Sequence, residues 1–210
     1  ADLKKATVGA MSGIFGASGQ SCIAGSRLLV ERSVYDRVVE DLSQRSAAIR
    51  MGNPLDMATE MGPGANEAQL DRILSSVASA KREGARLVSG GGRASGPGLD
   101  GGYFIQPTIF ADVVNGMKLA QHEIFGPVLA VIPFDQEAQA VAIANATSYG
   151  LASGIWTRDL SRSLRVTRAI RAGTVWVNTY RMSASQTPVG GIKESGYGRE
   201  RREEGLAEVM

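Results

Sequence analysis

The sequence is poor in the residues that build disulfides and metal centres. Its 210 residues include one cysteine and one histidine. A single cysteine excludes an intramolecular disulfide framework, and one cysteine with one histidine cannot form a protein-only zinc site of the usual type. We therefore expect no metal. If Cys22 has a function, that function uses its free thiol.

Long apolar segments and a strong net charge are also missing. No apolar run approaches the roughly 20 residues that span a bilayer, and the start lacks the apolar stretch of a signal peptide. The formal net charge is +2, with no long basic run, so we expect neither nucleic acid nor a membrane as a partner. These absences predict a cytoplasmic protein. Because the chain starts without Met, inside a helical pattern, we also expect it to be a fragment of a longer protein.

What is present is a globular composition, with 43% hydrophobic and 21% charged residues. Helical and extended patterns alternate, and several strands are apolar on both faces. This alternation predicts one α/β domain with a largely parallel sheet and helices on both faces. Helices are expected from Asp2, which can cap the first of them, to the glycines at 16–19, over 34–49 after a cap at Ser33, from Asn66, which opens the next helix, to about Gly84, and over 138–145 and 160–170. Strands are expected over 27–30, 86–88, 103–105, 108–110, 128–134, 151–156 and 174–178.

The segment 89–102 is crowded with glycine and contains the letters GxGxxG at 96–101. A dinucleotide fingerprint must leave a strand and open a helix, so that the helix N-terminus faces the pyrophosphate. Here Tyr-Phe-Ile and a proline follow, which is extended chain. We therefore interpret the segment as an exposed loop or hairpin.

Cys22 lies in a predicted turn between the first helix and the first strand, with Gly19 and Gly25 on either side. A lone cysteine is often an inert residue of the core. Small flanking residues and a turn that aims N–H groups at an anion would instead suit a nucleophile. A third possibility is a thiol hydrolase, in which His122 would lie within hydrogen-bond reach of Cys22.

Two further segments have both a purely structural and a functional interpretation. Glu123 and Phe125 lie on a Gly-Pro turn before an apolar strand, either as a solvated carboxylate and a core aromatic or as a ligand-facing loop at a strand end. The glycines of 190–198, with Lys193 and Arg199, can form an anion nest or a tight crossing of chain segments. We favour the crossing.

Taken together, the motifs resemble the catalytic half of the NAD(P)-dependent aldehyde dehydrogenase superfamily. The resemblance runs in order over nearly the whole chain. Its motifs are Gly-Gln-Ser-Cys-Ile-Ala-Gly-Ser-Arg at 19–27, Met-Gly-Pro at 61–63, Gly-Tyr-Phe-Ile-Gln-Pro-Thr at 102–108, Glu-Ile-Phe-Gly-Pro-Val at 123–128, Tyr-Gly-Leu-Ala-Ser-Gly-Ile-Trp-Thr at 149–157, Gly-Thr-Val-Trp-Val-Asn-Thr-Tyr at 173–180 and Pro-Val-Gly-Gly-Ile-Lys-Glu-Ser-Gly-Tyr-Gly-Arg-Glu at 188–200.

The resemblance implies a role for four residues. Cys22 would be the nucleophile that converts an aldehyde to a thiohemiacetal and then, after hydride transfer to NAD or NADP, to a thioester that water cleaves. Glu123 would bind the ribose hydroxyls of the nicotinamide, Phe125 would lie beside the nicotinamide, and Gln69 would be a more distant cofactor contact. We therefore expect the thiol to lie at the floor of an accessible crevice, within touching distance of the Glu-Ile-Phe turn. The family's full-length enzymes are homodimers or homotetramers, which we expect here too.

The resemblance also implies what lies outside residues 1–210, the expected catalytic thiol domain. The family's cofactor-binding domain, deacylating glutamate, oxyanion asparagine and most of the oligomerisation arm precede the equivalent of this segment. We therefore expect the chain alone to bind NAD(P) weakly and to turn over negligibly. His122, Ser183 and Val189 depart from the family's usual residues, which suggests a wider, less aromatic substrate tunnel. A CoA-acylating enzyme and a non-catalytic homologue remain as alternatives.

Overall fold

A computed structural model describes residues 1–207 and 209–210 of the chain. These residues form two compact units. The larger unit is Ala10–Asp135, and the smaller unit combines Ala1–Gly9 with Gln136–Met210.

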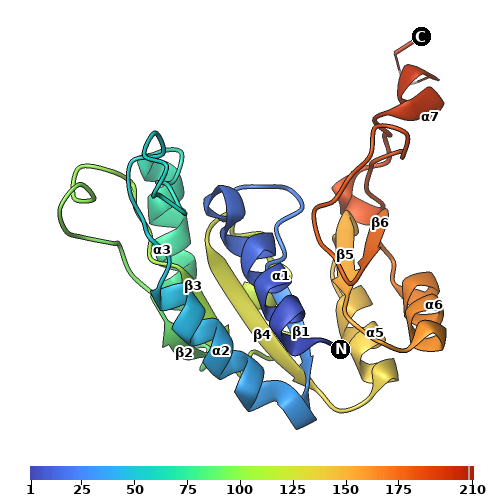
Figure 1. The fold of residues 1–210 in the computed structure, drawn as a ribbon, viewed down its shortest axis with the longest axis horizontal. Coiled ribbons are helices and arrows are strands. Elements are labelled where there is room, and N and C mark those ends of the chain that lie inside the picture. The colour runs from blue at the N-terminus through green and yellow to red at the C-terminus, as the bar shows by residue number, and fades with distance from the viewer. Residues whose placement is uncertain (208) are drawn as a thin grey trace. The chain divides into compact units, whose positions relative to one another are not determined.

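The larger unit is built on a four-stranded sheet in the order β1-β4-β3-β2 (Figure 1). Strand β4 (Val128–Phe134) lies parallel to both β1 (Arg27–Glu31) and β3 (Thr108–Ala111), whereas β2 (Arg86–Ser89) is antiparallel to β3. The first five residues of β4 are all buried, as its continuous apolar run predicts. The predicted α/β class is confirmed, with one antiparallel strand at the edge of a mostly parallel sheet.

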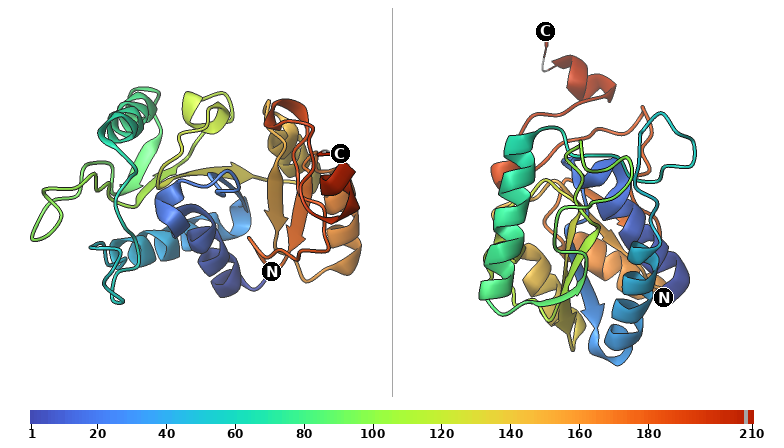
Figure 2. Two further views of the ribbon diagram at one scale, coloured as in Figure 1. Left: turned by 90° about the horizontal axis from the view of Figure 1, so that it is seen from above. Right: turned by 90° about the vertical axis from the view of Figure 1, so that its left-hand side faces the viewer.

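Helices cover both faces of this sheet, also as predicted. The part of α1 (Leu3–Phe15) in this unit and α2 (Tyr35–Ala47) lie on one face, and α3 (Glu67–Arg82) with the short α4 (Lys118–Gln121) on the other (Figure 2). Each long helix turns an apolar stripe inward, so that Leu42 of α2 and Ile73 of α3 are completely buried.

Two of the three predicted helix caps are confirmed. The carboxylate of Asp2 accepts a hydrogen bond from the Lys5 N–H at 3.2 Å, and the amide oxygen of Asn66 accepts one from the Gln69 N–H at 2.9 Å. The predicted cap at Ser33 is wrong. Its hydroxyl bonds to Glu31 instead, because a 3-10 turn, η2 (Arg32–Val34), comes between the strand and α2.

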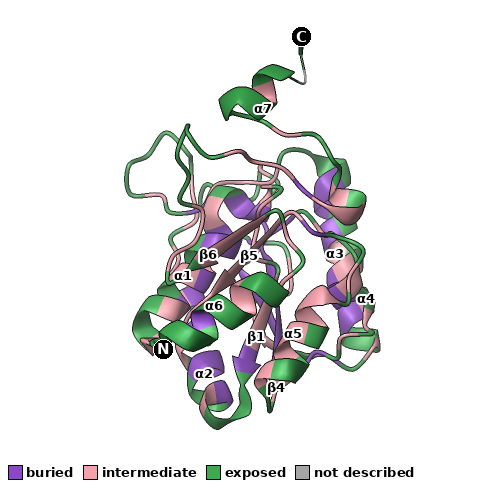
Figure 3. Cartoon of the chain, turned by 90° about the vertical axis from the view of Figure 1, so that its right-hand side faces the viewer, coloured by how far each residue is buried: buried purple, intermediate pink, exposed green. Residues whose placement is uncertain are grey.

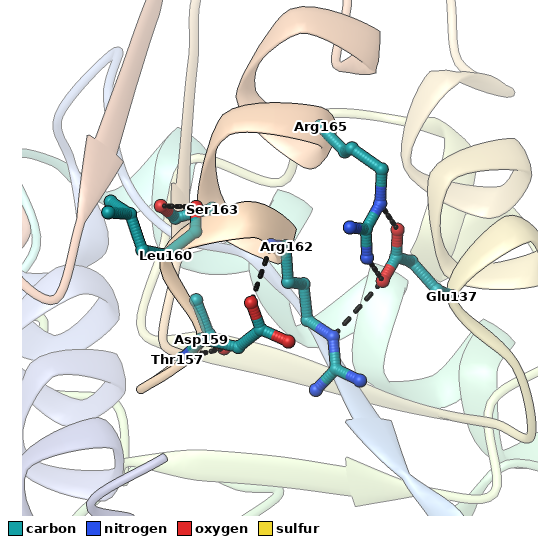
Figure 4. Close-up of polar contacts among 7 residues, drawn as sticks. All are labelled: Glu137, Thr157, Asp159, Leu160, Arg162, Ser163 and Arg165. Carbon is teal, nitrogen blue, oxygen red and sulfur yellow. Dashed lines mark hydrogen bonds and ion pairs between the residues drawn. The ribbon is translucent and has the colours of Figure 1, made fainter.

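The smaller unit contains two parallel strands, β5 (Ala152–Ile155) and β6 (Thr174–Val177), and the helices α5 (Glu137–Asn145), α6 (Leu160–Ala169) and α7 (Arg202–Ala207). Most positions of α6 are exposed (Figure 3). Asp159 caps α6, and the carboxylate of Glu137 joins α5 to α6 by accepting hydrogen bonds from Arg162 and Arg165 (Figure 4). Hydrogen bonds from Arg165 hold the pKa of Glu137 below its usual range, with a smaller contribution from Arg162.

The glycine-rich segment near the C-terminus is a crossing of chain segments, as we favoured. A Cβ at Gly173 would overlap the carbonyl of Gly190, so the two segments meet backbone to backbone. The Lys193 ammonium donates to the carbonyls of residues 145 and 147, and the Arg199 guanidinium to those of residues 191, 197 and 198. These cations therefore stabilise the crossing rather than line an anion nest.

The segment carrying the GxGxxG letters forms successive turns, and extended chain rather than a helix follows it. The Leu99 N–H bonds to the Gly96 carbonyl at 2.9 Å and the Gly102 N–H bonds to the Leu99 carbonyl at 3.0 Å. The interpretation as a loop is confirmed. The expected strand at 103–105 is reduced to a single bridge between Arg93 and Ile105.

A buried tyrosine gives the larger unit a dependence on alkaline pH. Tyr35 donates to the Val131 carbonyl and accepts from the Asp112 N–H, and burial raises its pKa to about 12. The unfolded chain loses this proton near the ordinary value of about 10. The stabilising effect is thus fully present below about pH 10 and is lost as the pH rises toward 12.

We expect Tyr35→Phe to reduce the slope with which the free energy of unfolding falls above about pH 10. At neutral pH the variant should be less stable by about 1 kcal/mol, because the Asp112 N–H loses its acceptor. Urea unfolding of both proteins at pH 8, 10 and 11 measures this. Burial also raises the pKa of Tyr180 to about 12, so Tyr180→Phe serves as the comparison in the smaller unit. An unchanged alkaline slope in Tyr35→Phe would contradict the assignment.

Candidate active site

The sole cysteine lies in the turn that joins α1 to β1. Before it, Ala17, Ser18 and Gly19 all adopt left-handed backbone conformations, with φ of 54°, 54° and 70°. Two of these residues carry side chains, and such strain persists only where surrounding structure holds it, as it does at many functional sites. The thiol of Cys22 is free and exposed. The expectation of an accessible sulfhydryl is confirmed, and the interpretation as an inert core cysteine is excluded.

Hydrogen bonds to one neighbouring segment fix this thiol loop, which we define as residues 17–26. The Ser18 hydroxyl donates to the Gly62 carbonyl at 2.9 Å, and the Gln20 amide oxygen accepts from the Ala65 N–H at 3.1 Å. At its other end, the Gly25 N–H bonds to the Gly13 carbonyl at 3.1 Å. The loop is therefore held at both ends.

A second strained segment, the turn at residues 122–127, leads into β4. Phe125 has a φ of 56°, which is unusual for an aromatic residue, and the residue is 39% exposed. Glu123 is exposed as well. Neither residue is buried in the core, so the interpretation of Phe125 as a core aromatic is wrong.

The sheet explains why the thiol loop and this turn come together. Strands β1 and β4 are parallel neighbours in which Arg27 pairs with Ala130, and Cys22 and Phe125 each lie five residues before those partners. Parallel strands begin at the same edge, so the two segments meet at the amino ends of β1 and β4. Open α/β sheets usually bind ligands outside the carboxyl ends of their strands, whereas these two segments lie at the amino ends.

Glycine allows the two segments to touch. A Cβ at Gly19 would overlap the backbone of Gly126 and Pro127, and a Cβ at Gly126 would overlap the side chain of Ile73 on α3. The turn is thus packed between the thiol loop on one side and α3 on the other. The contact is made three residues before Cys22, so the thiol loop meets the Glu-Ile-Phe turn, and the proximity of the Cys22 sulfur itself stays a prediction.

Three of the four predicted site residues line one cavity. Its volume is about 550 Å³, and its lining comprises Gln69, Arg72, Ser75, Ser76, Glu123, Ile124 and Phe125. Cys22 lies on the adjoining loop and does not line this cavity. Gln69 is 8% exposed, and its amide nitrogen donates to the carbonyls of Ile124 and Phe125 at 2.9 and 2.8 Å. The lining residue Arg72, absent from our predictions, is one helical turn from Gln69.

Other chemistries receive no support from the described residues. Among them no hydrogen bond joins His122 to Cys22, and the His122 N–H bonds to the Lys118 carbonyl. Residues 1–207 and 209–210 hold no group of three or more side chains that would suit a metal ion. Within the same ranges, every helix is too short or too polar to cross a membrane.

The fold, together with the exposed cysteine at the amino ends of the parallel strands, defines a thiol-bearing α/β protein. A family model described as "Aldehyde dehydrogenase family" matches residues 1–210. The chain belongs to this family.

Curated relatives and solved structures agree with this assignment. The chain is 48% identical over 200 residues to a betaine aldehyde dehydrogenase of Sinorhizobium fredii (strain NBRC 101917 / NGR234), covering 95% of this chain and 41% of that protein. The crystal structure of betaine aldehyde dehydrogenase from Staphylococcus aureus in complex with NAD+ matches with a TM-score of 0.98 and 39% identity, over 99% of this chain and 41% of that one. HpcC from Thermus thermophilus matches with a TM-score of 0.96 and 44% identity, over 99% and 41% of the two chains.

The chain thus spans about two fifths of the length of the relatives it matches. It is homologous to NAD-dependent aldehyde dehydrogenases, and structural homologues were crystallised with NAD+. One of those homologues carries a BME-modified cysteine.

Proposed function

We propose that this chain is the catalytic thiol domain of an NAD(P)-dependent aldehyde dehydrogenase and that Cys22 is its nucleophile. The single observation that carries the proposal is the exposed thiol on a strained loop, packed by Gly19 against the turn that bears Glu123 and Phe125. Strain that is held in place at an accessible thiol is typical of a site whose geometry serves chemistry.

In the proposed reaction the thiolate sulfur of Cys22 bonds to the aldehyde carbon, and the carbonyl oxygen becomes an alkoxide. The backbone N–H of Cys22 helps to stabilise this charge. When bound, the nicotinamide cofactor accepts the hydride that leaves the substrate carbon. The resulting thioester is cleaved by water, which releases a carboxylic acid and regenerates the thiol.

The residues of the cavity suit the ribose and the nicotinamide. The carboxylate of Glu123 can accept hydrogen bonds from two ribose hydroxyls, and the exposed ring of Phe125 offers an apolar surface to the nicotinamide. Gln69 and Arg72 supply further polar groups on the α3 side of the cavity. Either NAD or NADP satisfies this part of the site.

In this proposal the complete enzyme is a homodimer or homotetramer. The deacylating base and the cofactor domain lie in the part of the family's full-length enzymes to which this chain does not align. Betaine aldehyde is the first aldehyde to test, because several relatives of this chain are betaine aldehyde dehydrogenases. An assay with added CoA tests the CoA-acylating alternative, in which CoA rather than water cleaves the thioester. A product that carries CoA would favour that alternative.

Alkylation of the 210-residue chain tests the nucleophile directly. Cys22 is its only cysteine, so iodoacetamide can label one thiol per chain. We expect the folded chain to react faster than the same chain unfolded in urea, because the proposed nucleophile would be activated by its folded surroundings, and an unfolded chain has none. The rate, followed by mass spectrometry from pH 6 to 9, gives the thiolate fraction. A folded rate equal to or below the unfolded rate would favour the non-catalytic homologue.

A further inference from the structure

The amide of Gln69 is committed to the backbone of the turn at residues 122–127, which we call the cavity turn. Its nitrogen donates to the Ile124 carbonyl at 2.9 Å and to the Phe125 carbonyl at 2.8 Å, and the side chain is buried. A primary amide has two N–H donors, so both are used by these bonds. A direct hydrogen bond from this nitrogen to a cofactor would require the release of one of these carbonyls.

The turn that Gln69 holds is the strained one. Phe125 adopts a φ of 56°, which an aromatic residue rarely does without support. The two bonded carbonyls belong to Ile124 and Phe125, so the two bonds together restrain the peptide units on both sides of the Phe125 Cα. Loss of both bonds would let Phe125 return to an ordinary backbone conformation and would redirect its side chain.

Gln69 itself has a fixed position. Its own N–H bonds to the Asn66 cap at 2.9 Å, and Ile73, one turn further along α3, packs against Gly126. The segment just before α3, residues 62–65, carries the hydrogen bonds to Ser18 and Gln20 of the thiol loop. Residues 62–69 therefore hold both the thiol loop and the cavity turn.

We propose that Gln69 is a positioning residue, which sets the place of Glu123 and Phe125 relative to Cys22, rather than a direct ligand of the cofactor. This inference rests on the proposed function for its kinetic consequence, although the structural part stands without it. The substitutions Gln69→Glu and Gln69→Met separate the two roles. Glutamate has the same shape and can still accept a hydrogen bond from a ribose hydroxyl, but it cannot donate to the two carbonyls.

The first test uses the 210-residue chain without cofactor. Chymotrypsin cleaves after exposed aromatic residues, and Phe125 lies in the turn, whereas Tyr197 is 92% exposed in another segment. We expect both variants to raise the cleavage rate after Phe125 by about 10-fold while that after Tyr197 stays constant. Gln44→Glu on α2, where the glutamine bonds to the exposed Glu40, controls for the change in charge. Unchanged cleavage after Phe125 in both variants would overturn the proposal.

The second test uses the complete enzyme and separates kcat from KM. Positioning predicts that Gln69→Glu and Gln69→Met both lower kcat by about 10-fold or more, with the KM for aldehyde unchanged. Direct contact predicts that Gln69→Glu keeps its kcat and that only the KM for cofactor changes, which would overturn the proposal. Cys22→Ser in parallel distinguishes the two levels of failure. If Cys22→Ser stays active, the proposed function fails, whereas the cleavage result still decides the role of Gln69.

Discussion

Cys22→Ser should lower the rate of aldehyde oxidation by the complete enzyme by more than about 1,000-fold, because no other side chain on the thiol loop can replace the sulfur nucleophile. A serine hydroxyl at the same position is far less ionised at neutral pH than a thiol, so the first bond to the aldehyde carbon would form very slowly. The measurement is the production of NADH under saturating aldehyde and NAD.

The folded state provides the control for this experiment. Cys22 is exposed, so the substitution removes no core packing, and the variant should match the parent in thermal unfolding and in its affinity for NAD. A variant that unfolds normally but keeps more than a tenth of the activity would contradict the nucleophile assignment. Such a result would instead favour oxidation of the aldehyde without a covalent adduct at Cys22.

Gly19→Ala is expected to have the largest effect on stability. The new methyl group would overlap the backbone of Gly126, and no side-chain rotation can relieve an overlap with backbone atoms. The residue also has a φ of 70°, which alone costs a non-glycine residue about 1 kcal/mol. The two effects together should lower the free energy of unfolding by more than about 3 kcal/mol.

Gly84→Ala is the matched control for this substitution. Gly84 has a φ of 91°, but a Cβ there meets nothing within 4 Å, so only the backbone strain remains. Its cost should be about 1 kcal/mol. Urea unfolding of both variants measures the difference. Equal losses in the two proteins would mean that the thiol loop and the cavity turn are not in tight contact.

Local signals in the sequence were sufficient to predict much of the fold. The apolar run of β4 (Val128–Phe134) and the cap at Asn66 are properties of neighbouring residues, and both occur as predicted. The errors come from short elements. Helix α4 has only four residues, too few for a periodic pattern, and the 3-10 turn η2 displaced the predicted start of α2.

The candidate site was predictable in its residues but not in its construction. Motif resemblance pointed to Cys22, Glu123, Phe125 and Gln69. The hydrogen bonds from Gln69 span 55 and 56 residues, and no local pattern encodes a contact over that separation. Nor does the sequence signal the strain, because the left-handed residue is a phenylalanine rather than a glycine or asparagine.

The turn-rich loop around residues 96–102 has a practical consequence for engineering. Gly96, Gly98 and Gly101 each have open space where a side chain would be, and the loop returns to its start through the bond from the Ala94 N–H to the Phe104 carbonyl. Exposed loop tips of this kind tolerate inserted sequence. An affinity epitope or a small fluorescent reporter introduced there would mark the protein at a site separate from the thiol loop.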